Sequence, residues 1–431
     1  MRVVIKRTSK KEMEQRIRGY YWLPGQSREK DGRPGILTIK NDGSHSLEVF
    51  GAFRESQHFE STKTVYGFSE KGKEISLLQV TDGGWEVSMP GFAISRYSGS
   101  YALIGGHFLD KSQFKVCAVR VRVPYLMEWH GNSGFSEKHE NDKEGNLLKF
   151  TIEYSFPKTL KVQIDELQVS IAPVFRIKGD RINAAELNQE TFLQVEVPTS
   201  RSFTEVYYPS VDNMLKFFSF AVGAPIRPDK ILAYTESIES KYLVEVYVAF
   251  AIIMERSSKR IARQEMRFTF NHIGSIADQV LSAWLLNSQR ILPAINQYFA
   301  GLHNDNLFLE NEFLNITQAL EVLHRTLYKG DFNFRERLID LCNRSSIANT
   351  FLVQTEKFIE YLYNSRNYYT HYPEDLKEKA LSGPDLFWLT QKARVLFEIH
   401  LMYELSFSES LVDQILRKNI HYNNIKIHST I

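Results

Sequence analysis

The sequence predicts an α+β protein in two parts: a β-rich, sandwich-like part over residues 1–270 and an all-α helical bundle over residues 271–431. Two patterns lead to this prediction. From about residue 15 to 200, apolar residues recur with a period of two between turn residues, which is typical of strands. From about Asn271 onward they recur at spacings of three and four, which is typical of helices. A chain of 431 residues is long enough for two or three domains.

Turn residues separate the first predicted strands. Asn41-Asp42-Gly43, between residues 36–38 and 46–50, predicts a hairpin. Thr81-Asp82-Gly83-Gly84, between residues 75–80 and 85–88, predicts a second one by the same rule. The strands together predict either a sandwich or a strongly bent sheet.

Later strands of this part follow the same alternation. In residues 115–123, valines alternate with Arg120 and Arg122, which predicts one buried and one basic face. The charged stretch 131–145 reads as a loop. Further strands are expected at residues 150–154, 161–171, 192–197, 242–254 and 267–270.

Residues 203–222 change to a helical period, as one helix or as two broken at Pro209, and Gly223 stops it. A local basic cluster lies near the end of the β-rich part. It is either a solvated surface or a contact with RNA, and its members are Arg256, Lys259, Arg260, Arg263 and Arg267.

The second part predicts a bundle of amphipathic helices. Connections are short, so neighbouring helices should be antiparallel. The tail, residues 420–431, is expected to be frayed. The helices are expected at residues 276–298, 309–327, 334–342, 355–371, 383–405 and 409–418.

The segment Arg366-Asn367-Tyr368-Tyr369-Thr370-His371 carries the chemistry. Arg366 lies on the apolar stripe of its helix, where a charge requires a partner. Pro373 should end the helix near His371. Arginine suits phosphate and histidine transfers protons near neutral pH. Five residues on a helix place two side chains about 140° apart, so only an unwinding last turn would bring them together. Otherwise the two residues simply cap the helix end.

Several N-terminal segments resemble the ApeA N-terminal domain. They are Tyr20–Gly25, Pro34–Leu37, Leu47–Phe53, Tyr101–Phe108 and Tyr125–Trp129. In the helical part, Arg366-Asn367 with His371, and the helix containing residues 321–325, resemble the HEPN domain that accompanies ApeA-type domains.

The resemblance implies a metal-independent antiphage endoribonuclease without a cofactor, acting in abortive infection on tRNA or other structured RNA. It implies a homodimer through the HEPN domain, because the reaction needs both an acid and a base, and each chain supplies only one histidine for these two roles. His371 would move the proton, Arg366 would hold the phosphate charge, and Asn367 would orient either group. The N-terminal part would sense a phage component or restrain the nuclease.

Two neighbouring residues have open roles. Glu321 either pairs with Arg325 one helical turn away or reaches Arg366 across the bundle. Tyr372 stacks on an unpaired base, packs, or accepts a nucleotide from a partner enzyme. A non-catalytic HEPN module that only dimerises or binds is the other alternative.

Composition sets further bounds. The net charge is only +2, so any basic surface is local, and the two cysteines fit a reducing cytoplasm. The N-terminus has no apolar core typical of a signal peptide, and no apolar run is long enough to span a membrane. No phosphate-binding glycine loop and no zinc-ligand spacing occurs.

Overall fold

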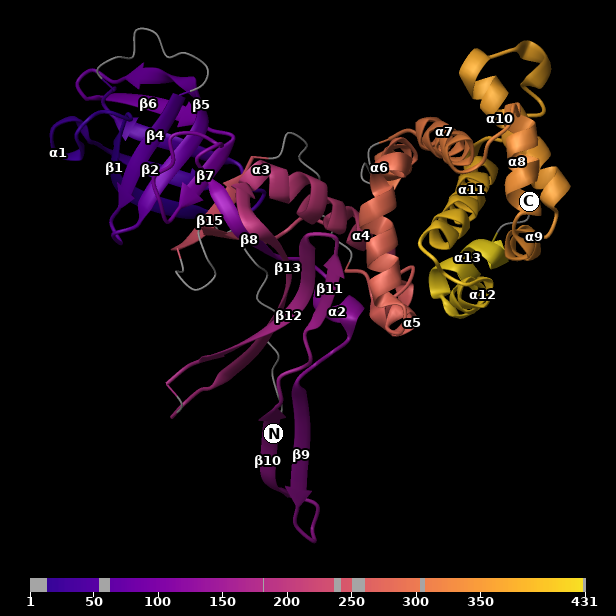
Figure 1. The fold of residues 1–431 in the computed structure, drawn as a ribbon, viewed down its shortest axis with the longest axis horizontal. Coiled ribbons are helices and arrows are strands. Elements are labelled where there is room, and N and C mark those ends of the chain that lie inside the picture. The colour runs from indigo at the N-terminus through magenta and orange to yellow at the C-terminus, as the bar shows by residue number, and fades with distance from the viewer. Residues whose placement is uncertain are drawn as a thin grey trace.

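The computed structural model describes residues 14–53, 63–180, 182–235, 242–249, 260–302 and 307–428. The chain is α+β, as predicted: strands dominate the N-terminal region and helices the C-terminal region (Figure 1). Among the described residues, none of the helices combines the length and apolar character needed to cross a membrane.

The N-terminal strands alternate with short turns. They are β1 Gln15–Trp22, β2 Arg33–Ile39, β3 His45–Phe50, β4 Lys63–Ser69, β5 Glu74–Val87, β6 Ala93–Ser98, β7 Tyr101–Ile104, β8 Lys115–Arg122, β9 Phe135–Asn141, β10 Leu147–Tyr154, β11 Leu160–Ile164, β12 Leu167–Lys178, β13 Glu186–Ser202, β14 Lys230–Thr235 and β15 Tyr242–Val248.

Thirteen of these strands form one sheet, in the order β11-β12-β13-β8-β14-β15-β7-β5-β4-β1-β2-β3-β6. An additional pairing of β5 with β6 closes β5, β4, β1, β2, β3 and β6 into a barrel. Of the two arrangements that the sequence left open, the strands therefore adopt the strongly bent sheet. The barrel encloses its own apolar cluster, which includes Tyr21, Leu37 and Val65.

One predicted hairpin is confirmed and the other is wrong. Gly43, with φ of 84°, lies in the turn between β2 and β3. Residues 81–84 are instead part of the continuous strand β5, where the register with β6 shifts between Asp82 and Trp85. Gly84 has φ of 93° and donates its N–H to Asp82 Oδ1 at 2.8 Å. The glycine pair thus forms a β-bulge, which bends β5 from its partners β4 and β7 toward β6.

The predicted loop at residues 131–145 is also wrong, because residues 135–141 form β9 and pair with β10 in a projecting hairpin (Figure 1). Its charged residues are exposed, so no apolar alternation marked the strand. The alternation in β8 is confirmed by the buried Val119 and Val121. Its basic face is paired, since Arg120 donates to Gln194 at 2.6 Å and Arg122 to Glu190 at 2.9 Å.

Four helices occur among the strands, and nine helices make up the C-terminal region in the described part of the chain. They are α1 Arg28–Asp31, α2 Leu126–His130, α3 Phe203–Val206, α4 Asn213–Val222, α5 Phe270–Ile273, α6 Ala277–Leu302, α7 Leu309–Leu327, α8 Phe334–Asn343, α9 Ser346–Leu352, α10 Thr355–His371, α11 Gly383–Glu404, α12 Glu409–Lys418 and α13 Ile420–His428, with a π-helix at Tyr207–Asp212 and 3₁₀ turns at Arg263–Glu265 and Glu374–Leu376.

Pro209 lies in the π-helix between α3 and α4. The helical segment is therefore interrupted at Pro209, as one of the two alternatives predicted, by a π-helical turn. Gly223, with φ of 80°, ends α4 as expected. The strand expected at residues 267–270 is wrong: this segment leads into α5. The tail is not frayed up to His428, because α13 buries Tyr422 and Ile425.

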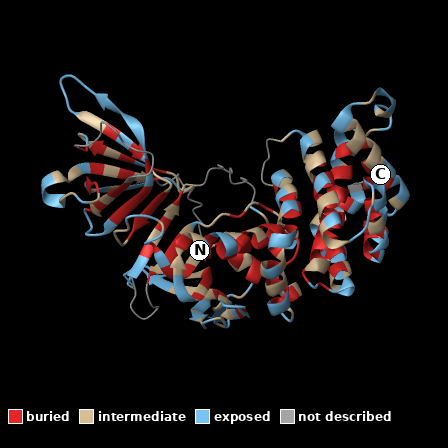
Figure 2. Cartoon of the chain, turned by 45° about the horizontal axis from the view of Figure 1, so that its top comes forward, coloured by how far each residue is buried: buried red, intermediate tan, exposed pale blue. Residues whose placement is uncertain are grey.

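A second apolar cluster runs from β8 and β13 through α4 and α6 to α11 and α12. Figure 2 shows buried residues continuing through the central helices into the bundle. Side chains of the strand-rich and helical regions therefore pack in one continuous core.

Candidate functional site

Helix α10 presents the hexapeptide 366–371 at its C-terminal end. Its buried side chains include Phe358, Leu362 and Ser365, which fix the helix against the bundle. Tyr372 follows in the left-handed region with φ of 51°, and its N–H donates to the Tyr368 carbonyl at 2.6 Å. The predicted end of the helix near His371 is confirmed, with Pro373 just beyond it.

Arg366 has the partner that its position on the apolar stripe required. Its Nη2 lies 3.7 Å from Oε2 of Glu321 on α7, and its Nη1 donates to Asn367 Oδ1 at 3.1 Å. The guanidinium carbon also lies 5.2 Å from the centre of the Phe334 ring on α8. The side chain remains 29% exposed. Three elements thus hold the guanidinium while part of it faces solvent.

Both contacts that the sequence left open for Glu321 are present. Its Oε1 accepts a hydrogen bond from Arg325 at 2.7 Å, and its Oε2 faces Arg366. One carboxylate therefore bridges two guanidinium groups, one on its own helix and one on α10.

His371 is exposed, and within the described chain its imidazole has no hydrogen-bond partner. Because α10 stays helical through this residue, His371 and Arg366 point about 140° apart and are separated by a rise of about 7.5 Å. The last turn does not unwind. Within a single chain, the helix therefore directs the two side chains to different sides of α10.

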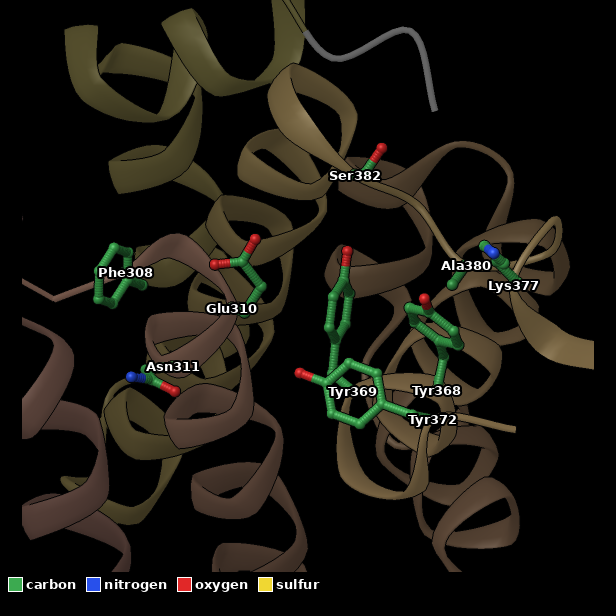
Figure 3. A pocket seen from close by; sticks show the side chains of 9 residues that line it. All are labelled: Phe308, Glu310, Asn311, Tyr368, Tyr369, Tyr372, Lys377, Ala380 and Ser382. Carbon is green, nitrogen blue, oxygen red and sulfur yellow. The ribbon is translucent and has the colours of Figure 1, made fainter. Parts of the chain in front are cut away.

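Tyrosines of the same helix end line a hollow beside the motif. Tyr368 contacts Tyr369 and Tyr372 edge to face, with ring centroids 5.2 and 5.4 Å apart. The hollow has a volume of about 500 Å³ and is lined on its other side by Phe308, Glu310 and Asn311 at the start of α7 (Figure 3).

The three members of the predicted basic cluster that the structure describes differ in exposure and in their contacts. Arg267 is only 6% exposed and donates from Nε to Glu398 Oε1 at 3.1 Å, so its predicted contact with RNA is wrong. Arg260 is exposed and paired with Glu128. Arg263 is half-buried against Gly131, with its Nε and Nη2 shielded from solvent. Arg256 and Lys259 lie outside the described residues.

Two further histidines of the bundle belong to its core. His324 is fully buried, with Nε2 2.8 Å from Asp340 Oδ2. His400 lies 2.9 Å from the Leu341 carbonyl through its Nε2, and burial lowers its pKa to about 4. In the described part of the chain, no group of three or more His, Cys, Asp or Glu is placed to hold a metal ion.

The periodicity on α10 and α7 predicted the positions of Arg366 and Glu321, but the residues around the tyrosine hollow were not predicted as a group. Phe308, Glu310 and Asn311 precede Tyr368 by almost sixty positions along the chain, so no local pattern links them.

Two family models match the chain. ApeA N-terminal domain 1 matches residues 16–284, and Apea-like HEPN matches residues 314–411. The second match contains Glu321, Arg366 and His371. Searches of curated proteins and of solved structures found no match. At family level these matches support an antiphage role with a nuclease-type HEPN domain. The N-terminal model covers more than half of the chain, and the chain therefore belongs to the ApeA family, with an ApeA N-terminal domain followed by an Apea-like HEPN domain.

Proposed function

We propose that the protein is a HEPN endoribonuclease that cleaves tRNA or other structured RNA during abortive infection. The observation that supports this most directly is how the Arg366 side chain is held. Its guanidinium is held by Glu321 and Asn367, yet remains partly exposed at the same helix end as His371. An arginine with a purely structural role on this stripe would not need a guanidinium that is partly exposed to solvent.

The reaction uses only the RNA and these side chains. His371 takes the proton from the ribose 2′-hydroxyl, and the 2′-oxygen attacks the adjacent phosphorus. Arg366 donates to the non-bridging phosphate oxygens as negative charge builds up. The bond from phosphorus to the 5′-oxygen breaks, and a second acid protonates that oxygen. The products are a 2′,3′-cyclic phosphate and a 5′-hydroxyl.

The second acid is His371 of another copy. One chain supplies one exposed histidine in this motif, turned away from its own Arg366. Two copies that meet at the ends of their α10 helices would provide an acid, a base and two guanidinium groups around one phosphate. Asn367 and Glu321 act as positioning residues, since both contact Arg366.

The N-terminal domain is the candidate sensor or restraint, and a phage component is its candidate trigger. Its core continues through α4 and α6 into the HEPN helices. A change in the N-terminal domain can therefore reach the bundle through packed side chains. We place the protein in the cytoplasm, where its RNA substrates are found.

The test is RNA cleavage by the purified full-length protein in the presence of EDTA. Wild type should give fragments ending in a 2′,3′-cyclic phosphate, and His371→Ala should give none. Total RNA from phage-challenged cells that express each form would name the substrate. Phage protection retained by His371→Ala, with unchanged RNA, would support a non-catalytic binding module instead.

Nucleotide addition at Tyr372 is the second candidate function. The side chain is exposed, at 65%, so a partner enzyme could reach its hydroxyl. Mass spectrometry of protein expressed with its genomic neighbours tests this, and an unmodified Tyr372 in an inactive complex would refute it.

A further inference from the structure

The hollow beside the motif has the composition of a nucleobase site. We propose that it binds one unpaired base of the RNA next to the cleaved phosphate, with guanine favoured over uracil. This inference rests on the proposed nuclease function and adds a specificity site to it.

Aromatic faces supply the first requirement of such a site. Tyr369 is fixed, because its hydroxyl donates to the Leu381 carbonyl at 2.8 Å and its ring contacts Phe313 in the core. Tyr368 and Tyr372 pack against it, and Tyr372 is largely exposed. Aromatic side chains held in this way are the usual platforms for unstacked RNA bases.

Polar groups without a partner at the rim of the hollow supply the second requirement of a nucleobase site. Within the described residues, the Tyr372 hydroxyl and the Asn311 amide have no hydrogen-bond partner. Glu310 lies on the tyrosine side of α7 (Figure 3), close enough to raise the pKa of Tyr369 together with burial, which is the larger cause.

The negative charge of Glu310 determines which part of the RNA can enter the hollow on this side. A carboxylate accepts hydrogen bonds and repels phosphate, so the base edge and not the backbone faces this side. Guanine offers two adjacent donors, N1–H and the N2 amino group, which match the two oxygens of a carboxylate. Uracil offers one donor flanked by two acceptors, which the carboxylate would repel.

Lys377 provides the opposite charge on the far side of the hollow. Its ammonium pairs with Glu374 at 3.2 Å, but both side chains are exposed, so the pair is weak and Lys377 can turn to a phosphate. Tyr372 directly follows His371. A base stacked on Tyr372 therefore places its own phosphate near the proposed catalytic histidine.

The experiment measures binding separately from cleavage. The full-length His371→Ala protein is titrated with fluorescent heptauridylate containing one central guanosine, with heptauridylate itself, and with the same strand carrying a central abasic residue. The guanosine strand should bind most tightly. Adding Tyr372→Ala should weaken its binding about 5- to 150-fold, the range for loss of a stacked aromatic.

Tyr372→Phe should retain more of this affinity than Tyr372→Ala, because it loses the rim hydroxyl but keeps the stacking ring. It keeps the ring and the same β-carbon in the left-handed conformation, so Phe and Ala variants carry the same backbone strain. Tyr242→Ala is the matched control, because Tyr242 is exposed to a similar degree, 63%, on β15. Glu310→Gln should reduce the preference for guanosine, because it weakens binding of the guanosine strand and no longer repels the acceptors of uracil.

The outcomes separate the two proposals. Equal binding of all three strands, or no effect of Tyr372→Ala, overturns the base site even if wild type cleaves RNA. A guanosine preference that depends on Tyr372, without any cleavage by wild type, supports the base site and overturns the nuclease. Absence of both binding and cleavage overturns both.

Discussion

Nη2 of Arg366 on α10 lies 3.7 Å from Oε2 of Glu321 on α7, and the two residues are 45 positions apart in the chain. The same carboxylate accepts from Arg325, so Glu321 is fixed on its own helix before it meets Arg366. This arrangement holds the guanidinium between two helices while part of its surface remains exposed to solvent.

Glu321→Gln should lower kcat for RNA cleavage about 10- to 100-fold, because a misdirected guanidinium no longer meets the phosphate in the transition state. KM should change little. The control is Glu360→Gln, an exposed position on α10. Steady-state kinetics on both variants check this, and an unchanged kcat in Glu321→Gln would show that the contact is structural only.

Arg366→Lys should lower kcat about 100- to 1000-fold, although the charge is kept. A lysine offers a point charge and not the planar fork that contacts Glu321, Asn367 and phosphate together. Arg325→Lys, on the exposed side of Glu321, should cleave like wild type. The thermal unfolding midpoint of each variant shows whether a loss of activity reflects folding; activity near wild type in Arg366→Lys would refute the role of the fork.

Glu398→Gln should destabilise the protein by about 3–5 kcal/mol, because it leaves the Arg267 charge buried without its counter-ion. The Glu398 carboxylate also accepts from Tyr298 at 2.6 Å and Tyr422 at 2.8 Å. Burial alone would raise its pKa, but Arg267 and these hydroxyls outweigh burial and lower it.

The measurement is urea unfolding at neutral pH. Glu128→Gln, which breaks the exposed pair with Arg260, is the matched control and should cost under about 1 kcal/mol. Similar losses in the two variants would mean that the buried pair contributes no more than a surface pair.

Acidification should remove stability through His400. Its folded pKa is about 4, below the value of about 6.5 expected in the unfolded chain. A depressed folded pKa gives stability that is fully present above pH 6.5 and is lost as pH falls toward 4. Between pH 7.5 and 5.5 this site alone should lower the free energy of unfolding by about 1 kcal/mol.

The glutamine in His400→Gln cannot titrate. The free energy of unfolding of this variant should therefore fall less than that of wild type over the same pH step, by about the amount given above. Urea midpoints of both proteins at pH 7.5 and 5.5 provide the comparison. Other buried histidines, such as His421, affect both proteins equally. Identical pH dependence in the two would show that His400 does not carry this loss.

Much of the fold was predictable because period and turn chemistry are local properties of the chain. Alternation placed the buried valines of β8, and spacings of three and four placed α6, α7, α10 and α11. The position of Arg366 on an apolar stripe predicted that it has a partner, and Pro373 predicted where its helix ends. These conclusions need only the geometry of one element.

Other features depended on packing between distant elements. Asp82-Gly83-Gly84 has the composition of a hairpin turn, but closure of the barrel makes it a bulge within β5. Arg267 resembles its basic neighbours in sequence, yet burial beside Glu398 removes it from the surface.

The sequence by itself determined the α+β division, most helices and the Arg366–His371 motif. Only the tertiary structure decided that Glu321 meets Arg366, that His371 faces away from it, and that three tyrosines share a hollow with the start of α7. The physical reason is that periodicity specifies which face of a helix is buried, whereas the residues that meet across that face depend on how the helices are packed.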